Sequence, residues 1–106
     1  MIEIIQAEGG KNIFRLEATD TDTKAMVGFA ELKGIEKPVP VFYCEVEKDY
    51  MGKKIGTEML KKAVQYAKSI HREGIFVRFD GNVRAKMMLK KQGFRFYTNE
   101  IAMLEI

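Results

Sequence analysis

The segment YMGKKIGT at residues 50–57 decides how the rest of the chain is interpreted. Gly52 and Gly56 flank Lys53 and Lys54, just before a stretch with helical periodicity. At the start of a helix, several backbone N–H groups have no hydrogen-bond partner, and the positive end of the helix dipole lies there. Because glycine lets the main chain approach a ligand closely, the segment is typical of a turn that binds phosphate. The alternative is an exposed loop that only precedes an amphipathic helix.

The residues after this segment repeat with the period of an amphipathic helix. Apolar side chains recur from Met59 to Ile70 on one face, and lysines occupy the other. We expect this helix to begin at Gly56 and to end near Gly74. The two lysines of the segment would then lie where the helix dipole disfavours cations, which indicates a functional reason for them.

The residues before the segment alternate with period two, as in β-strands. Short turns rich in Gly, Thr and Asp separate the first three stretches, so we expect antiparallel hairpins. Two prolines precede the fourth stretch, where a missing backbone donor is tolerated. The four predicted strands cover residues 3–7, 12–18, 24–32 and 41–46.

The residues after the long helix predict one more helix between two strands. A short apolar strand covers residues 75–79, and Asn82 is the predicted N-cap of a helix that ends near Gln92. Gly93 follows as a left-handed C-terminal cap, and residues 96–104 form the last strand. The expected order is ββββαβαβ, an α/β (α+β) fold with a mixed, mostly antiparallel six-stranded sheet in one domain of residues 1–106.

Composition excludes several classes of protein. Of 106 residues, 46% are hydrophobic and 31% charged, as in ordinary globular domains. No apolar run is long enough for a membrane span, and the N-terminus does not resemble a signal peptide. We therefore expect a cytoplasmic protein without membrane contact. One cysteine, Cys44, and one histidine predict neither a disulfide nor a metal site.

Charge is distributed unevenly along the chain. Residues 1–47 carry 5 basic and 9 acidic groups, a net −4, whereas residues 48–95 carry 13 and 4, a net +9. The basic region predicts a polyanionic ligand, either a nucleotide cofactor or a nucleic acid. Nucleic acid is disfavoured, because aromatic residues do not alternate with Lys and Arg on a strand.

Two segments together resemble the GNAT superfamily of N-acetyltransferases. Residues 46–60, VEKDYMGKKIGTEML, are similar to the Q/R-x-x-G-x-G/A loop that binds acetyl-CoA in that family. Residues 82–94, NVRAKMMLKKQGF, are similar to its second signature, N-x-x-A-x-x-L/F-Y-x-x-x-G-F. The resemblance implies a GNAT-like acyl-CoA N-acyltransferase fold, acetyl-CoA as acyl donor, and an amine acceptor on a protein, a peptide or a small molecule.

The resemblance also implies which residues contact the coenzyme. They belong to the end of the fourth strand, where backbone N–H groups would polarise the thioester carbonyl, to the loop, and to the second helix. The implied residues are Cys44, Val46, Met51, Gly52, Lys53, Lys54, Ile55, Gly56, Thr57, Asn82, Lys86 and Leu89.

The chain departs from the family pattern in ways that bear on catalysis. Met51 stands in place of Gln or Arg, and Lys54 in place of the first loop glycine. Leu89 replaces a tyrosine thought to protonate the leaving thiolate. No carboxylate lies early in the fourth strand, so Glu45 is the candidate base. The alternative is a catalytically degraded domain that binds coenzyme A or a partner protein.

The connection between the first two strands is short. Family members usually insert two helices there, whereas this chain has only residues 8–11. We therefore expect one uncovered sheet face, made polar by Arg15, Glu17, Glu45 and Glu47. Such an open acceptor site suits a protein or peptide amine, or a pocket that a second subunit completes in a homodimer.

Overall fold

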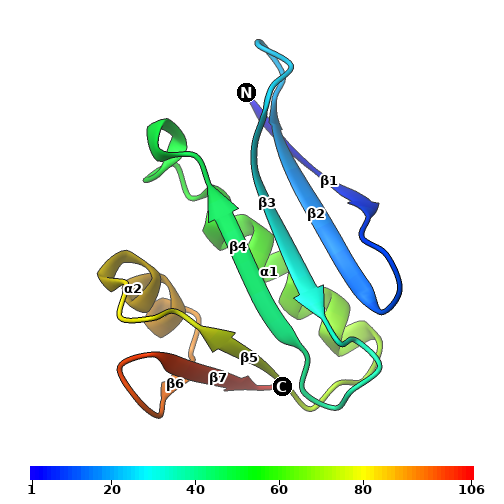
Figure 1. The fold of residues 1–106 in the computed structure, drawn as a ribbon, viewed down its shortest axis with the longest axis vertical. Coiled ribbons are helices and arrows are strands. Elements are labelled where there is room, and N and C mark those ends of the chain that lie inside the picture. The colour runs from blue at the N-terminus through cyan, green and yellow to red at the C-terminus, as the bar shows by residue number, and fades with distance from the viewer.

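A seven-stranded sheet carries two α-helices on one of its faces (Figure 1). The computed structural model describes all 106 residues. The elements are β1 (Ile2–Glu8), β2 (Ile13–Asp20), β3 (Met26–Lys33), β4 (Val41–Val46), the short 3-10 helix η1 (Lys48–Tyr50), α1 (Ile55–Ser69), β5 (Gly74–Arg78), α2 (Val83–Lys91), β6 (Arg95–Phe96) and β7 (Ile101–Glu105). The strand order is β1-β2-β3-β4-β5-β7-β6. Only β4 and β5 run parallel, so the predicted mixed, mostly antiparallel fold is confirmed.

The core lies between the sheet and the helices. From α1, the buried side chains recur at helical spacing, as Ile55, Met59, Leu60, Ala63 and Ala67. The buried strand residues alternate with half-buried or exposed ones, as the period-two pattern predicts. Neither helix has the length and apolar composition needed to cross a bilayer.

The prediction of a single last strand is wrong, because this region forms two strands. A turn interrupts it, and β6 and β7 pair as an antiparallel hairpin, which gives seven strands instead of six. At the turn, the Thr98 hydroxyl accepts hydrogen bonds from the backbone N–H groups of Glu100 (3.0 Å) and Ile101 (3.1 Å). Side-chain to backbone bonds of this kind stabilise turns against extended structure.

The predicted end of the long helix is also wrong. Helix α1 ends at Ser69, and His71 takes a left-handed conformation with φ 61°. The N–H of Arg72 then donates to the Ala67 carbonyl at 2.9 Å, the bond that closes a Schellman motif. Gly74 does not end the helix but allows β5 and β7 to approach closely. A Cβ there would lie 2.6 Å from the Leu104 carbonyl oxygen of β7.

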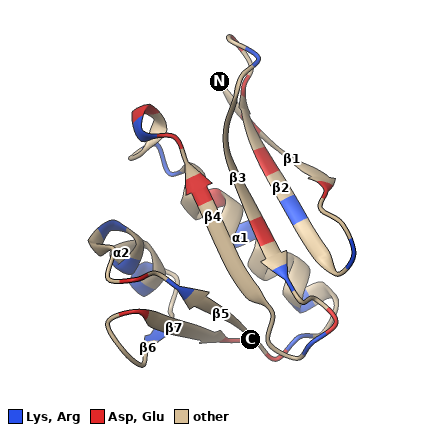
Figure 2. Cartoon of the chain, in the orientation of Figure 1, with Lys and Arg blue, Asp and Glu red and all other residues tan.

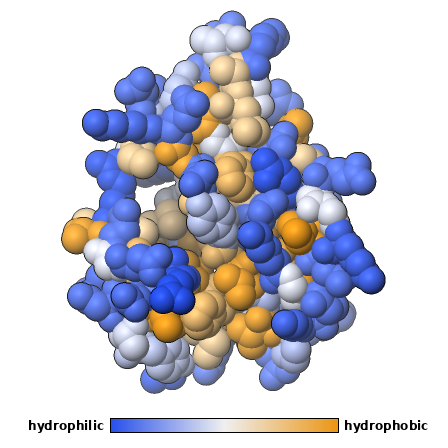
Figure 3. All heavy atoms as spheres, in the orientation of Figure 1, coloured by the Kyte–Doolittle hydropathy of each residue, from blue (hydrophilic) through white to orange (hydrophobic).

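The face opposite the helices has no cover, as predicted from the short β1–β2 connection. Its charges are partly paired, because Arg15 bonds Glu17 and Glu31 at 2.9 Å each. Figure 2 shows basic and acidic positions close together on β2 and β3. The Arg15 guanidinium also lies 4.4 Å from the centre of the Phe29 ring. Figure 3 views this face and shows apolar side chains scattered among hydrophilic ones. We call it the open face.

Candidate functional site

Strands β4 and β5 separate and leave a cleft between them. They pair only at Val41 with Phe76 and at Phe42 with Val77. Beyond Phe42, the strands diverge around a cleft of about 1260 Å³ that β4, the start of α1, β5 and α2 line. Figure 1 shows β4 running away from β5 toward η1.

The main chain of β4 points polar groups into this cleft. The N–H of Glu47 donates to Val27 of β3 at 2.8 Å, whereas the Pro40 carbonyl accepts from Phe76 of β5 at 3.0 Å. Because these groups alternate sides along a strand, the N–H and C=O of Cys44 and Val46 face the β5 side. Strand β5 has no paired residue opposite them. They are therefore available to a ligand in the cleft.

Helix α1 begins at one end of the cleft without a side-chain cap. Its N-cap residue, Lys54, has a left-handed backbone with φ 63° and makes no capping bond. The first helical bond runs from the Glu58 N–H to the Lys54 carbonyl at 3.0 Å. The N–H groups of Ile55, Gly56 and Thr57 precede that bond and find no acceptor within the chain. This helix terminus is suited to bind an anion.

Helix α2 begins differently. The predicted N-cap, Asn82, is confirmed: its side-chain oxygen accepts from the Ala85 N–H at 2.9 Å. An orphan donor of α2 is thus satisfied within the chain. Gly93 has φ 89°, as expected for the left-handed residue after this helix.

The two loop glycines lie against the cleft walls. A Cβ on Gly56 would be 3.6 Å from the Met88 sulfur and 3.7 Å from the Cys44 sulfur. Gly52 has φ 85°, and a Cβ there would lie 3.6 Å from a guanidinium nitrogen of Arg84. The loop and the first turn of α2 therefore face each other across the cleft.

The cleft is positively charged. Five basic residues and two acidic ones line it, a net +3; these are Lys54, Lys61, Arg78, Arg84 and Lys91, with Glu58 and Asp80. Arg78 is already paired with Asp80 at 3.0 Å. Lys54, Arg84 and Lys91 make no ion pair, so they remain free for an anionic ligand.

The structure brings most of the residues implied to contact the coenzyme together around this cleft. The exceptions are Lys53, whose ammonium lies 5.1 Å from the centre of the Tyr50 ring, and Lys86, whose ammonium lies 5.6 Å from that of Phe96. Sequence reasoning missed Arg84. Its place in the first turn after Asn82 was the available signal, because this turn faces the loop.

Two cleft residues limit the possible chemistry. Leu89 is fully buried and carries no hydroxyl that could protonate a leaving group. Burial raises the pKa of the Cys44 thiol to about 12. Because a thiol with such a pKa stays protonated at neutral pH, Cys44 is not suited to be a nucleophile.

A hydrogen bond joins the start of the loop at residues 50–57 to the turn between β2 and β3. The Tyr50 hydroxyl donates to the Asp20 carboxylate at 2.8 Å, which joins η1 to the end of β2. This bond raises the pKa of Tyr50 and lowers that of Asp20. The neutral hydroxyl and the ionised carboxylate therefore coexist near pH 7.

Glu45, the predicted base, lies on the open face and not in the cleft. Its carboxylate accepts a 2.6 Å hydrogen bond from the Tyr43 hydroxyl, and this bond raises the pKa of Tyr43. Glu45 lines a second, smaller pocket, which Cys44 and Val46 also line. The end of β4 thus separates the cleft from Glu45.

Solved structures share this fold at low sequence identity. A domain from Methanocaldococcus jannaschii matches with a TM-score of 0.76 at 19% identity, over 92% of this chain and 69% of that one. The ribosomal-protein-S5-alanine acetyltransferase of Vibrio fischeri matches with a TM-score of 0.77 at 14% identity, over 89% and 62%. A GNAT-family acetyltransferase of Staphylococcus aureus matches with a TM-score of 0.74 at 19% identity, over 89% and 68%.

The sequence itself identifies the family. No curated protein matches the chain. Residues 3–94, which include the whole cleft, match the model of the acetyltransferase (GNAT) family. The chain therefore belongs to the GNAT acetyltransferase family.

Proposed function

We propose that residues 1–106, acting as one domain, transfer an acetyl group from acetyl-CoA to an amine. The observation that carries this proposal is the positively charged cleft that ends at the uncapped start of α1. The N–H groups of Ile55, Gly56 and Thr57 would bind the pyrophosphate of the coenzyme, and Lys54 and Arg84 would add charge.

The β4 main chain would hold the other end of the donor. The free polar groups of Cys44 and Val46 suit the amides of the pantetheine arm, and an N–H near Val46 would polarise the thioester carbonyl. The polarised carbonyl carbon becomes a better target for an amine.

The reaction that we propose is a direct displacement. The amine nitrogen bonds to the carbonyl carbon, the carbon–sulfur bond breaks, and the sulfur leaves with the electron pair as thiolate. The proton lost by the amine passes to a base, for which Glu45 is the candidate, and the thiolate takes a proton from water. Because a thiol with a pKa of about 8.5 is a tolerable leaving group, Leu89 in place of tyrosine would slow the reaction by about 100-fold at most.

The alternative is a domain that binds coenzyme A without turnover, which the buried Leu89 favours. Calorimetric titration with acetyl-CoA, followed by a thiol-release assay over a panel of amines, separates the two. Binding together with thiol release supports the transferase. Binding without release supports the alternative, and absence of binding contradicts both.

A further inference from the structure

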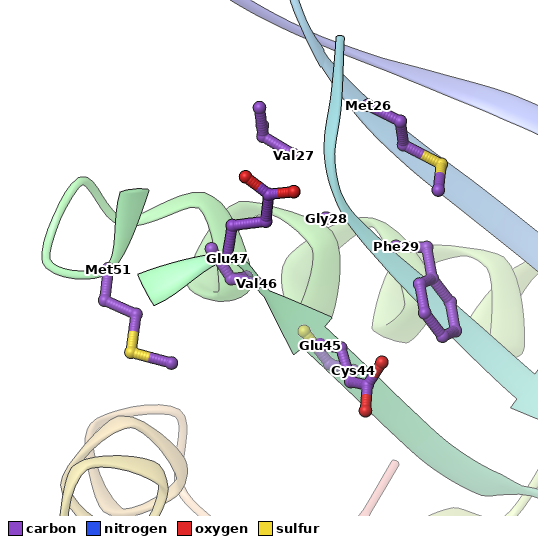
Figure 4. Close-up of a pocket in the computed structure, with 9 residues that line it drawn as sticks. All are labelled: Met26, Val27, Gly28, Phe29, Cys44, Glu45, Val46, Glu47 and Met51. Atoms are coloured by element: carbon purple, nitrogen blue, oxygen red, sulfur yellow. The ribbon is translucent and has the colours of Figure 1, made fainter. Parts of the chain in front are cut away.

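A second pocket lies against the end of β4, on the side of the open face. It has a volume of about 470 Å³, and residues from β3, the end of β4 and Met51 line it (Figure 4). It shares three lining residues with the cleft: Cys44, Val46 and Met51. Since the proposed function places the thioester near Val46, this pocket is where an acceptor would approach it. The role of the pocket as an acceptor site therefore rests on the proposed function.

The walls of this pocket combine apolar surface with uncompensated negative charge. Met26, Phe29 and Met51 are its large apolar residues, and Glu45 and Glu47 are its only charged ones. Glu47 makes no ion pair and no side-chain hydrogen bond. A pocket with two carboxylates and no cation of its own favours a positively charged ligand.

The Arg15 guanidinium, which lies 4.4 Å from the centre of the Phe29 ring of this pocket, is not available to neutralise these carboxylates. Arg15 is engaged by Glu17 and Glu31 and covers the Phe29 ring. The Tyr43 hydroxyl is the one side-chain partner of Glu45. The negative charge of the pocket is therefore left for a ligand.

The two carboxylates occupy different parts of the pocket. Figure 4 shows the Glu45 carboxylate beside the Phe29 ring and the Glu47 carboxylate beyond the end of β4, pointing away from it. Each carboxylate therefore lacks a cation of its own and is open to a separate one. The arrangement suits a ligand with two nitrogen groups, one at each carboxylate.

We infer that the acceptor is an amine with a second cationic group, which Glu47 binds while the reacting amine lies near Glu45. The apolar side chains of Met26 and Phe29 would contact the hydrocarbon between the two nitrogens. The charges of the chain agree with this division. Residues 1–47 carry a net −4, so a cationic acceptor would approach on this side, whereas the anionic donor would enter through the +9 region of residues 48–95.

The test compares 1,4-diaminobutane with n-butylamine, which have the same carbon chain and differ by one charge. Acetyl-CoA is titrated first, and its binding tests the proposed donor site separately. With the coenzyme analogue desulfo-CoA bound, calorimetry should then show the diamine binding roughly 3- to 5-fold more tightly than the monoamine, the size of one exposed ion pair.

Two variants locate this preference. Glu47→Gln should reduce the ratio of affinities to about 1, because the second cation loses its partner. Glu3→Gln is the matched control, since Glu3 is exposed on β1, two strands from the pocket, and should keep the wild-type ratio. Both side chains are exposed, so neither change should disturb folding.

Three results would overturn the inference: equal affinity for the two amines, no binding of the diamine to a protein that binds the coenzyme, or a preference that survives in Glu47→Gln. If acetyl-CoA itself fails to bind, the proposed function fails. In that case, diamine binding to the free protein that is lost in Glu47→Gln would support the cation site although the proposed function has failed. High salt should weaken the preference, because it screens exposed charges.

Discussion

The two helices of this chain begin in opposite ways. Helix α2 starts with Asn82, whose side chain caps the Ala85 N–H, whereas α1 starts with a left-handed lysine that caps nothing. Both starts line the same cleft. The difference teaches that the chain satisfies one helix terminus itself and leaves the N–H groups of the other without a partner, as the proposed anion site requires. Changes at the two termini should therefore separate stability from binding.

The largest expected effect comes from closing the open terminus. Gly56→Asp places a carboxylate among the free N–H groups of α1, where it would bond to them and repel a pyrophosphate. We expect the affinity for acetyl-CoA to fall roughly 100-fold, about 2.7 kcal/mol. Calorimetric titration measures it.

Gly56→Ala is the control for this change. Its Cβ would lie at ordinary contact distance from Met88 and Cys44, so the fold and most of the affinity should persist. If Gly56→Asp binds acetyl-CoA as the wild type does, the phosphate site is not at the start of α1.

A smaller loss of binding is expected at Arg84, which faces the loop from α2. Arg84→Gln should lower the affinity for acetyl-CoA about 5- to 10-fold, because one charge-assisted contact to phosphate is lost. It should also make the affinity less sensitive to salt. Lys62→Gln, an exposed change on α1 outside the cleft, is the charge-matched control. If both variants lower the affinity for acetyl-CoA equally, Arg84 acts only through its charge at long range and does not contact the phosphate.

Changes at the capped start of α2 should affect stability. Asn82→Ala removes the bond to the Ala85 N–H, and we expect the free energy of unfolding to fall by about 1 kcal/mol. Urea denaturation followed by circular dichroism measures this. Asn82→Asp keeps an oxygen acceptor and should keep most of the stability. A neutral result for Asn82→Ala would remove the energetic distinction between the two helix starts.

The smallest expected effect has opposite signs for stability and binding. Lys54→Gly relieves the left-handed backbone of a non-glycine residue, and we expect a gain of roughly 0.5 kcal/mol in stability. The same change removes a cleft charge, so the affinity for acetyl-CoA should fall about 3-fold. Lys54→Asn, which tolerates the left-handed region, should lose affinity to a similar extent. A variant that loses stability would show that the backbone of Lys54 is not strained.

Much of this architecture could be predicted from local patterns. The period of two predicted β1 to β4, a short apolar stretch predicted β5, and Asn82 and Gly93 predicted both ends of α2. The end of α1 could not be predicted, because His71 adopts a left-handed conformation that sequence patterns assign to glycine. The break between β6 and β7 depends on the Thr98 hydroxyl bonding two backbone groups, a choice that is not visible as periodicity.

The candidate site was predictable where it depends on main chain and less so where it depends on long side chains. Gly52, Gly56 and the end of β4 lie around the cleft as the two signatures implied. Lys53 and Lys86 do not, because each ammonium instead lies over an aromatic ring. Spacing along a helix predicts the face on which a residue lies, but packing decides where the ammonium group of a flexible lysine lies.

The central claim is that the free N–H groups at the start of α1 bind the phosphates of the coenzyme. Nuclear magnetic resonance of ¹⁵N-labelled protein tests it most directly, by following backbone amides during titration with coenzyme A. We predict large downfield proton shifts at Ile55, Gly56 and Thr57, and smaller ones at the already capped Ala85. Saturable binding that leaves the three α1 amides unmoved, or moves Ala85 as strongly, would contradict the account.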